Sequence, residues 1–140
     1  MTRFPPPPEA DSEPVSAWDR VGVALVALCA ALAALFETLL VPLYVGSALV
    51  PVAVVLALMS NVVLPKMART LVPTTLAALA PFGAWLVVVL GFGTIGRPEG
   101  DVILPGAPSS LEFVTYGVLL GGALAGTVTV VWLSPPPAKR

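Results

Sequence analysis

Four long apolar segments dominate the hydrophobic pattern of the chain, and short polar or proline-containing stretches separate them. They cover about residues 21–41, 47–64, 71–92 and 113–133. A helix of roughly 20 residues crosses the hydrocarbon core of a bilayer, and each segment is close to that length. Apolar and polar positions do not alternate with period two, so the pattern favours helices over the strands of a barrel. The sequence therefore predicts four transmembrane helices.

The connections between these segments are short, "PLYVG" at 42–46 and "PKMART" at 65–70. Short connections make consecutive helices antiparallel neighbours. The fold class that follows is an all-α membrane protein, an antiparallel up-down bundle of four transmembrane helices. Pro81 falls inside the third helix and predicts a kink there. The other prolines near the helices mark predicted boundaries, where a missing N–H costs little: Pro42, Pro51, Pro65 and Pro73.

The basic residues predict the orientation of this arrangement. All but Arg97 fall on one side of it, namely Arg3, Arg20, Lys66, Arg69, Lys139 and Arg140. Because cytoplasmic segments carry an excess of Lys and Arg, we expect both termini in the cytoplasm and the loop 93–112 outside it. The abundance of Ala, Val, Gly and Pro, with Arg preferred over Lys, suggests a bacterium with a GC-rich genome. The predicted location is therefore a bacterial plasma membrane.

The domain organisation follows from the same pattern. Residues 1–17 are rich in proline and acidic side chains, and such a segment buries too little surface to order itself. We predict a disordered cytoplasmic tail there, a transmembrane domain over 18–134, and a short cytoplasmic tail over 135–140.

The amino-acid composition supports lipid as the surrounding medium and limits the kinds of ligand binding and catalysis that the chain can support. The chain is 57% hydrophobic and 11% charged, whereas soluble domains carry about 25% charged residues. A net charge of −1 gives no footprint for nucleic acid. With one cysteine and no histidine, the chain lacks the commonest general base and metal ligand. We predict no catalytic residues, cofactor or metal site, and hence no enzyme.

Glu37, in "ALFETLLVP", is the first candidate functional residue, because an ionisable group at membrane depth costs free energy. Small residues at helical spacing continue its face, so it is expected to point into the bundle. One interpretation is a carboxyl group coupled to protons or cations. The other is an interfacial carboxyl group that reaches the headgroups or pairs with Arg97.

The turn "GRPEGD" holds the second set of candidates, Arg97, Glu99 and Asp101. We interpret Arg97 as a clasp that pairs with these acids or with Glu37 and fixes the loop to the outer end of the bundle. The alternative is that Glu99 and Asp101 form a patch that binds a partner or a cation. Two carboxylates are a weak metal signal, because calcium takes 6–8 oxygen ligands.

The last segment contains two rows of small residues suited to close helix packing. One row is Gly117, Gly121 and Ala125, and the other is Gly122 and Gly126. These rows predict packing within the bundle, with packing against a second subunit as the alternative.

Two polar residues of the second segment, Ser60 and Asn61, are predicted to lie near its inner end, on the order of 20 Å from Glu37. On this basis they share no site with Glu37 and bond to neighbouring helices or to the backbone. Phe82 and Trp85 are expected to fill the kink at Pro81.

The stretch "RPEGDVILPG…YGVLLGGALAGTV", within residues 96–127, resembles an uncharacterised actinobacterial family of small four-helix membrane proteins. In that family an Arg-Pro-Glu-Gly-Asp turn precedes a Gly-rich last helix. The family has no assigned activity, so the resemblance implies only a membrane location and this topology.

Two functions remain open from the sequence. The first is an accessory, assembly or interaction subunit that contacts the bilayer and a membrane-protein partner, or a second copy of itself, through helix packing and the outer loop. The second is a minimal proton-coupled transporter in which Glu37 is the coupling carboxyl group.

Overall fold

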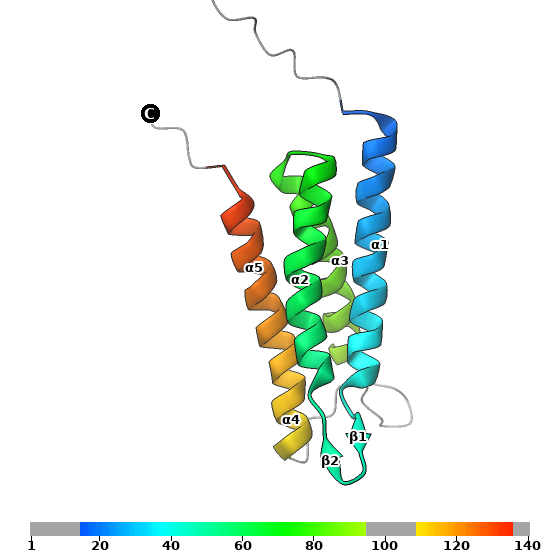
Figure 1. Ribbon diagram of the computed structural model, residues 1–140, viewed down its shortest axis with the longest axis vertical. Helices are drawn as coiled ribbons and strands as arrows, with labels where there is room; N and C mark the ends of the chain where they lie inside the picture. Colours follow the sequence, from blue (N-terminus) through cyan, green and yellow to red (C-terminus); the bar gives the residue numbers. More distant parts are fainter. Residues whose placement is uncertain (1–14, 95–108, 136–140) are drawn as a thin grey trace, which may run out of the picture.

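The computed structural model describes residues 15–94 and 109–135, and in these ranges the chain is almost entirely helical (Figure 1). Four spans are long and apolar enough to cross a membrane. Successive spans run in opposite directions, so that the start of the first and the end of the last lie at the same end (Figure 1). The spans consist of α1 (Ala17–Leu40), α2 (Val52–Leu71), α3 (Thr75–Thr94) and a last span made of α4 (Ser109–Tyr116), the π-helical turn η1 (Gly117–Gly121) and α5 (Gly122–Leu133). The predicted helical class and the four candidate spans are confirmed in this part of the chain.

Helix α1 begins four residues before the predicted start, because a capping box fixes its first turn. The Ser16 side chain accepts a hydrogen bond from the Asp19 backbone N–H at 3.1 Å, and Asp19 Oδ2 accepts one from the Ser16 N–H at 3.1 Å. Two otherwise unpaired donors of the helix start are satisfied in this way. The motif was visible in the sequence, but the hydropathy pattern alone does not report it.

The prediction that Pro65 ends the second helix is wrong. Helix α2 starts at Val52 rather than 47, and it continues through Pro65 to Leu71. Proline removes one backbone donor but keeps a helical φ, and membrane-type helices tolerate it where neighbouring groups compensate. The basic residues assigned to a loop, Lys66 and Arg69, instead lie in the last turns of α2, where the negative end of the helix dipole favours cations.

A β-hairpin, not a simple loop, joins α1 to α2. Strand β1 (Tyr44–Val45) pairs antiparallel with β2 (Ala48–Leu49), and the Val50 N–H donates to the Leu43 carbonyl at 2.9 Å. Gly46 has φ +64° at the first central position of the turn, the position that type II′ hairpin turns give to glycine.

We predict that Gly46→Ala weakens this hairpin by about 1 kcal/mol, because a Cβ disfavours the left-handed conformation. The Val50 amide should then exchange with deuterated solvent roughly five times faster, since 1.4 kcal/mol corresponds to a factor of ten. Ser47→Ala is the control, because Ser47 has no positive φ. Equal exchange in wild type and G46A would contradict the assignment of the turn.

Small side chains fill the space between the spans, and large apolar ones cover the outside. Alanines supply much of the core, at positions 30, 34, 53, 57 and 78, together with Phe82, Trp85 and Val89. Large side chains on the outer faces are half or more exposed, among them Leu25, Phe36, Leu76, Val87, Leu120 and Leu124. A protein in water buries such side chains, whereas hydrocarbon solvates them without cost.

Candidate functional site

Glu37 lies in the interior of the molecule, three residues before α1 ends at Leu40. Its residue exposure is 1%. The side chain turns toward α2 and α3, as predicted for a carboxyl group that points between the helices. Among the described residues it is the buried acid of the core, so its hydrogen-bond partners decide what it can do.

Two donors from two other helices meet the carboxyl group of Glu37. Ser60 Oγ of α2 donates to Oε1 at 2.7 Å, and Trp85 Nε1 of α3 donates to Oε2 at 2.6 Å. Trp85 is itself 1% exposed. We call Glu37, Ser60 and Trp85 the Glu37 cluster. It joins three spans through one side chain, and each carboxyl oxygen receives one donor.

The structure corrects the predicted separation of Ser60 from Glu37. The prediction assumes a second helix that ends near residue 64, and in such a helix Ser60 lies close to the inner end, far from Glu37. Because α2 runs over Val52–Leu71, Ser60 lies near its middle and reaches Glu37 on the antiparallel neighbour. Asn61 behaves as expected, because its Nδ2 donates to the Ala57 carbonyl at 2.9 Å.

The predicted role of Trp85 also changes, since its indole binds Glu37 rather than only filling space at Pro81. A signal for this contact existed in the sequence. Tryptophan prefers the ends of membrane spans, where its N–H meets water or headgroups. Trp85 lies mid-span, so its N–H requires an acceptor within the protein, and Glu37 is the acidic residue available in the neighbouring span.

The glycines of the last span face other helices of the same chain. A Cβ on Gly122 would lie 2.5 Å from the outer edge of the Trp85 ring, and one on Gly126 would overlap the ring of Phe82. A Cβ on Gly117 would meet Val54 of α2 at 2.8 Å, and one on Gly121 would meet Leu58 at 3.5 Å. The row of Gly122 and Gly126 thus lies against α3, and the row of Gly117 and Gly121 against α2. Ala125, the third member of the row of Gly117 and Gly121, is half-buried.

Gly122 also connects the last span to the Glu37 cluster. Its missing side chain leaves room for the Trp85 ring, whose N–H binds Glu37, and its Cβ position is 3.3 Å from Asn61 Nδ2. The π-helical turn η1 ends immediately before it. Close backbone approach at Gly122 therefore helps to hold the indole in the position from which it donates.

A hollow of about 290 Å³ borders the Glu37 cluster between α1 and α2. Glu37 and Ser60 are its polar lining residues, and the rest are Ala33, Phe36, Leu56 and Met59. A second hollow of about 330 Å³ shares Ala33, Met59 and Ser60 with the first and extends to Cys29, Val63 and Leu64. The cluster can accept hydrogen bonds or a proton there, while the walls are apolar.

Several predicted site residues lie outside the described residues. Arg97, Glu99 and Asp101 belong to this group, so the clasp and its pairing with Glu37 stay predictions. Within the described ranges, no group of three or more His, Cys, Asp or Glu side chains is placed to hold a metal ion.

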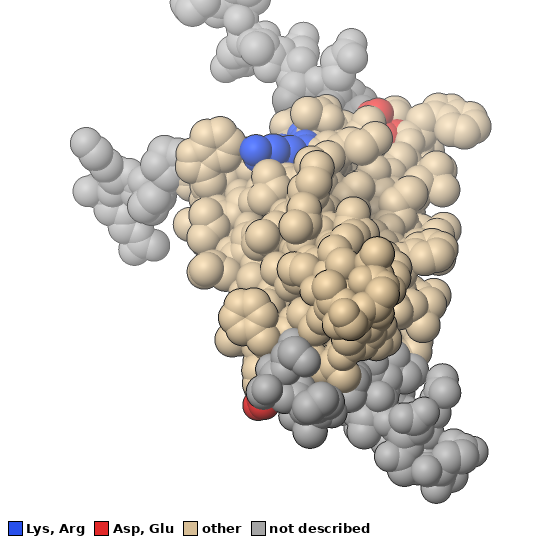
Figure 2. All heavy atoms as spheres, turned by 60° about the horizontal axis from the view of Figure 1, so that its bottom comes forward, with Lys and Arg blue, Asp and Glu red and all other residues tan. Residues whose placement is uncertain are grey.

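The described basic residues gather at one end of the molecule. Arg20 belongs to the first turns of α1, and Lys66 and Arg69 to the last turns of α2, which is the same end of the antiparallel pair (Figures 1 and 2). Lys66 Nζ lies 5.6 Å from the ring centroid of Trp132 on α5, a distance at which a cation is attracted to an indole face. These three of the six cations predicted for one side thus lie at one end of the molecule, while Arg3, Lys139 and Arg140 lie outside the described residues.

A scan against protein-family models, a search of curated proteins and a search of solved structures each found no match. The resemblance of residues 96–127 to an actinobacterial family therefore stays a prediction.

Proposed function

We propose that this chain is a multi-pass protein of a bacterial plasma membrane, with both termini in the cytoplasm and the connection between α3 and α4 outside. The predicted loop bounds of 93–112 are too wide, because α3 continues to Thr94 and α4 starts at Ser109. Four apolar spans support the membrane location. The grouping of Arg20, Lys66 and Arg69 at one end supports the orientation, because cytoplasmic segments are enriched in Lys and Arg.

Within that membrane we propose that the chain acts through contacts, as an accessory, assembly or interaction subunit. The observation that carries this proposal is that Glu37 uses both carboxyl oxygens for donors of its own chain. Its partners are a hydroxyl and an indole, neither of which forms an acid/base pair with a carboxyl group. The polar interior thus holds the spans together, and the apolar outer faces and the outer loop are left to contact lipid or a neighbouring protein.

Site-specific photo-crosslinking in native membranes tests the contact proposal. Because Cys29 is the single cysteine, a Cys29→Ser background accepts one new cysteine at a time. Leu28 on α1, Val87 on α3 and Leu124 on α5 are 55%, 74% and 67% exposed and sample three outer faces. Each would carry a photoactivatable maleimide.

One of the three faces is expected to give a discrete protein adduct, and the other two lipid adducts only. An adduct of twice the chain mass would identify the partner as a second copy. Protein adducts of equal yield at all three positions, or at none, would contradict the proposal, because random collision or lipid alone would then explain the result.

The second candidate is proton-coupled transport, and one observation favours it: Glu37 and Ser60 both line the hollow between α1 and α2. Wild type and Glu37→Gln would be reconstituted and mixed with lipophilic cations in weak buffer containing a pH indicator. Proton release by wild type and none by E37Q would replace the contact proposal with transport. No release by either protein, together with a face-specific adduct, would leave the contact proposal in place.

A further inference from the structure

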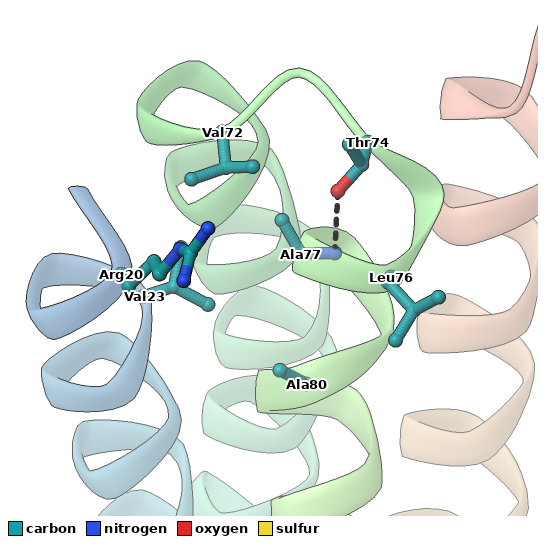
Figure 3. Close-up of a pocket in the computed structure, with 7 residues that line it drawn as sticks. All are labelled: Arg20, Val23, Val72, Thr74, Leu76, Ala77 and Ala80. Atoms are coloured by element: carbon teal, nitrogen blue, oxygen red, sulfur yellow. Dashed lines mark hydrogen bonds between the residues drawn. The ribbon is translucent and has the colours of Figure 1, made fainter. Parts of the chain in front are cut away.

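A hollow of about 400 Å³ lies between the first turns of α1 and the start of α3, at the basic end of the molecule (Figure 3). Its volume falls within the roughly 300–1,000 Å³ of small-ligand sites. Arg20 comes from α1 and Thr74 from the segment before α3, and Figure 3 shows them on opposite sides of the hollow. The remaining lining residues are Val23, Val72, Leu76, Ala77 and Ala80.

The polar rim of this hollow is electropositive. The guanidinium of Arg20 points from α1 toward the start of α3 (Figure 3). Thr74 Oγ1 accepts a hydrogen bond from the Ala77 N–H at 3.3 Å and so caps α3, whose first turn carries the positive end of the helix dipole. Two positive features therefore face one space.

No described carboxylate forms an ion pair with Arg20 at this rim. Asp19, the neighbouring acid, is engaged with Ser16, whose hydroxyl donates to Oδ2 at 2.7 Å. Arg69, three residues before Val72 on α2, has a buried Nη1 with no hydrogen-bond acceptor in the part of the chain that the structure describes. An anion at this end would thus meet positive charge that the described side chains leave uncompensated.

Below its polar rim the hollow is lined by apolar side chains, so an anion that also carries a hydrocarbon chain fits it best. Val23, Val72 and Ala80 present hydrocarbon, and Leu76 is 79% exposed beside them. A small, fully hydrated anion gains nothing from such walls. An amphiphile with a phosphate at the rim and an acyl chain along the walls satisfies both halves.

We propose that this hollow binds an anionic phospholipid, with the headgroup phosphate between Arg20 and the start of α3 and one acyl chain against Val23, Leu76 and Ala80. The proposal is independent of the partner sought above. It also assigns Arg20 a role that differs from that of Lys66, although both are cations at the same end.

Binding would be measured by native mass spectrometry and by thermal stability in detergent, titrating phosphatidylglycerol against phosphatidylcholine with the same chains. Wild type should prefer phosphatidylglycerol. Arg20→Gln should weaken its binding about 5–10-fold, because a cation near an anionic lipid contributes about 1 kcal/mol and 1.4 kcal/mol is a factor of ten. Lys66→Gln is the matched control, with the same charge change outside the hollow, and should change binding less than twofold.

A second pair of variants tests the apolar half without altering charge. Ala80→Phe narrows the hollow and should weaken lipid binding, whereas Leu79→Phe, on the next residue and not part of the lining, should not. If R20Q does not fold, this pair still decides the proposal.

Three results would overturn the proposal. Equal losses in R20Q and K66Q would show diffuse attraction to a basic surface rather than a site. Equal stabilisation by inorganic phosphate and by phosphatidylglycerol would identify a free-anion site. Unchanged lipid binding in A80F would show that the hollow does not hold an acyl chain.

Discussion

Gly122→Ala is expected to destabilise the fold by about 1–2 kcal/mol, while Gly121→Ala on the adjacent residue leaves it unchanged or slightly more stable. A Cβ on Gly122 would lie 2.5 Å from the buried Trp85 ring, and one on Gly121 would lie at an ordinary 3.5 Å from Leu58. Overpacking a filled core costs about 1–3 kcal/mol. Replacing glycine by alanine in a helix returns up to about 1 kcal/mol.

Both variants add one methyl group to a helical glycine, at the end of η1 and at the start of α5, so the main difference between them is the contact with α3. Unfolding in detergent would be followed by circular dichroism with increasing denaturing surfactant. Gly126→Ala, which meets the Phe82 ring, should behave like G122A. Equal stabilities of G121A and G122A would contradict the packing of the last span on α3.

Trp85→Phe provides a further check, because the smaller ring makes room beside Gly122. The cost of G122A should fall to below about half in the W85F background, a non-additivity expected only for residues in contact. An unchanged cost would mean that Gly122 acts on something other than the indole.

Hydropathy was sufficient to find the four candidate spans, because each span is a long apolar run that can be recognised without knowing how it packs on its neighbours. It was insufficient for the ends of the helices. The sequence predicts that Pro65 ends the second helix, yet α2 continues six residues beyond it. The loss of one backbone hydrogen bond at proline does not outweigh the stabilisation that packing gives to the helix. Ser16 and Asp19 form the capping-box motif that marks the start of α1. Their side-chain hydrogen bonds, and not hydrophobicity, fix this boundary.

The Glu37 cluster shows which information the sequence lacked. Glu37 stood out as an acid in an apolar run, but its partners depend on how far α2 slides along α1. A hairpin with Gly46 at its turn connects the two helices, and its pairing does not show as apolar periodicity. Because the predicted start and end of α2 are wrong, the sequence predicts that Ser60 and Glu37 lie far apart, although their side chains are hydrogen-bonded. Contacts between spans are thus less predictable than the spans themselves.

Glu37→Leu should destabilise the fold by about 1–3 kcal/mol, whereas Glu37→Gln should be close to neutral. Leucine leaves the Trp85 N–H buried without an acceptor, and an unsatisfied buried donor costs about 1–3 kcal/mol. The loss of the acceptor costs less free energy at Ser60, because its Oγ also lies 3.2 Å from the Ala57 carbonyl and its hydroxyl can donate to that oxygen instead. In E37Q the amide oxygen accepts from Trp85 and the amide nitrogen donates to Ser60, whose own hydrogen turns to Ala57.

Double-mutant cycles measure this asymmetry. The coupling energy of Glu37 with Trp85, from E37L and W85F, should be about 1–2 kcal/mol, near the upper end for hydrogen bonds between membrane helices. The coupling of Glu37 with Ser60, from E37L and Ser60→Ala, should stay below about 0.5 kcal/mol, because Ala57 compensates. Trp85 emission in a Trp18→Phe, Trp132→Phe background should shift to shorter wavelength in E37L and little in E37Q. Equal couplings to Ser60 and Trp85 would show that the serine hydroxyl has no alternative acceptor, and a negligible coupling to Trp85 would remove the indole–carboxyl bond from the forces that hold α1 to α3.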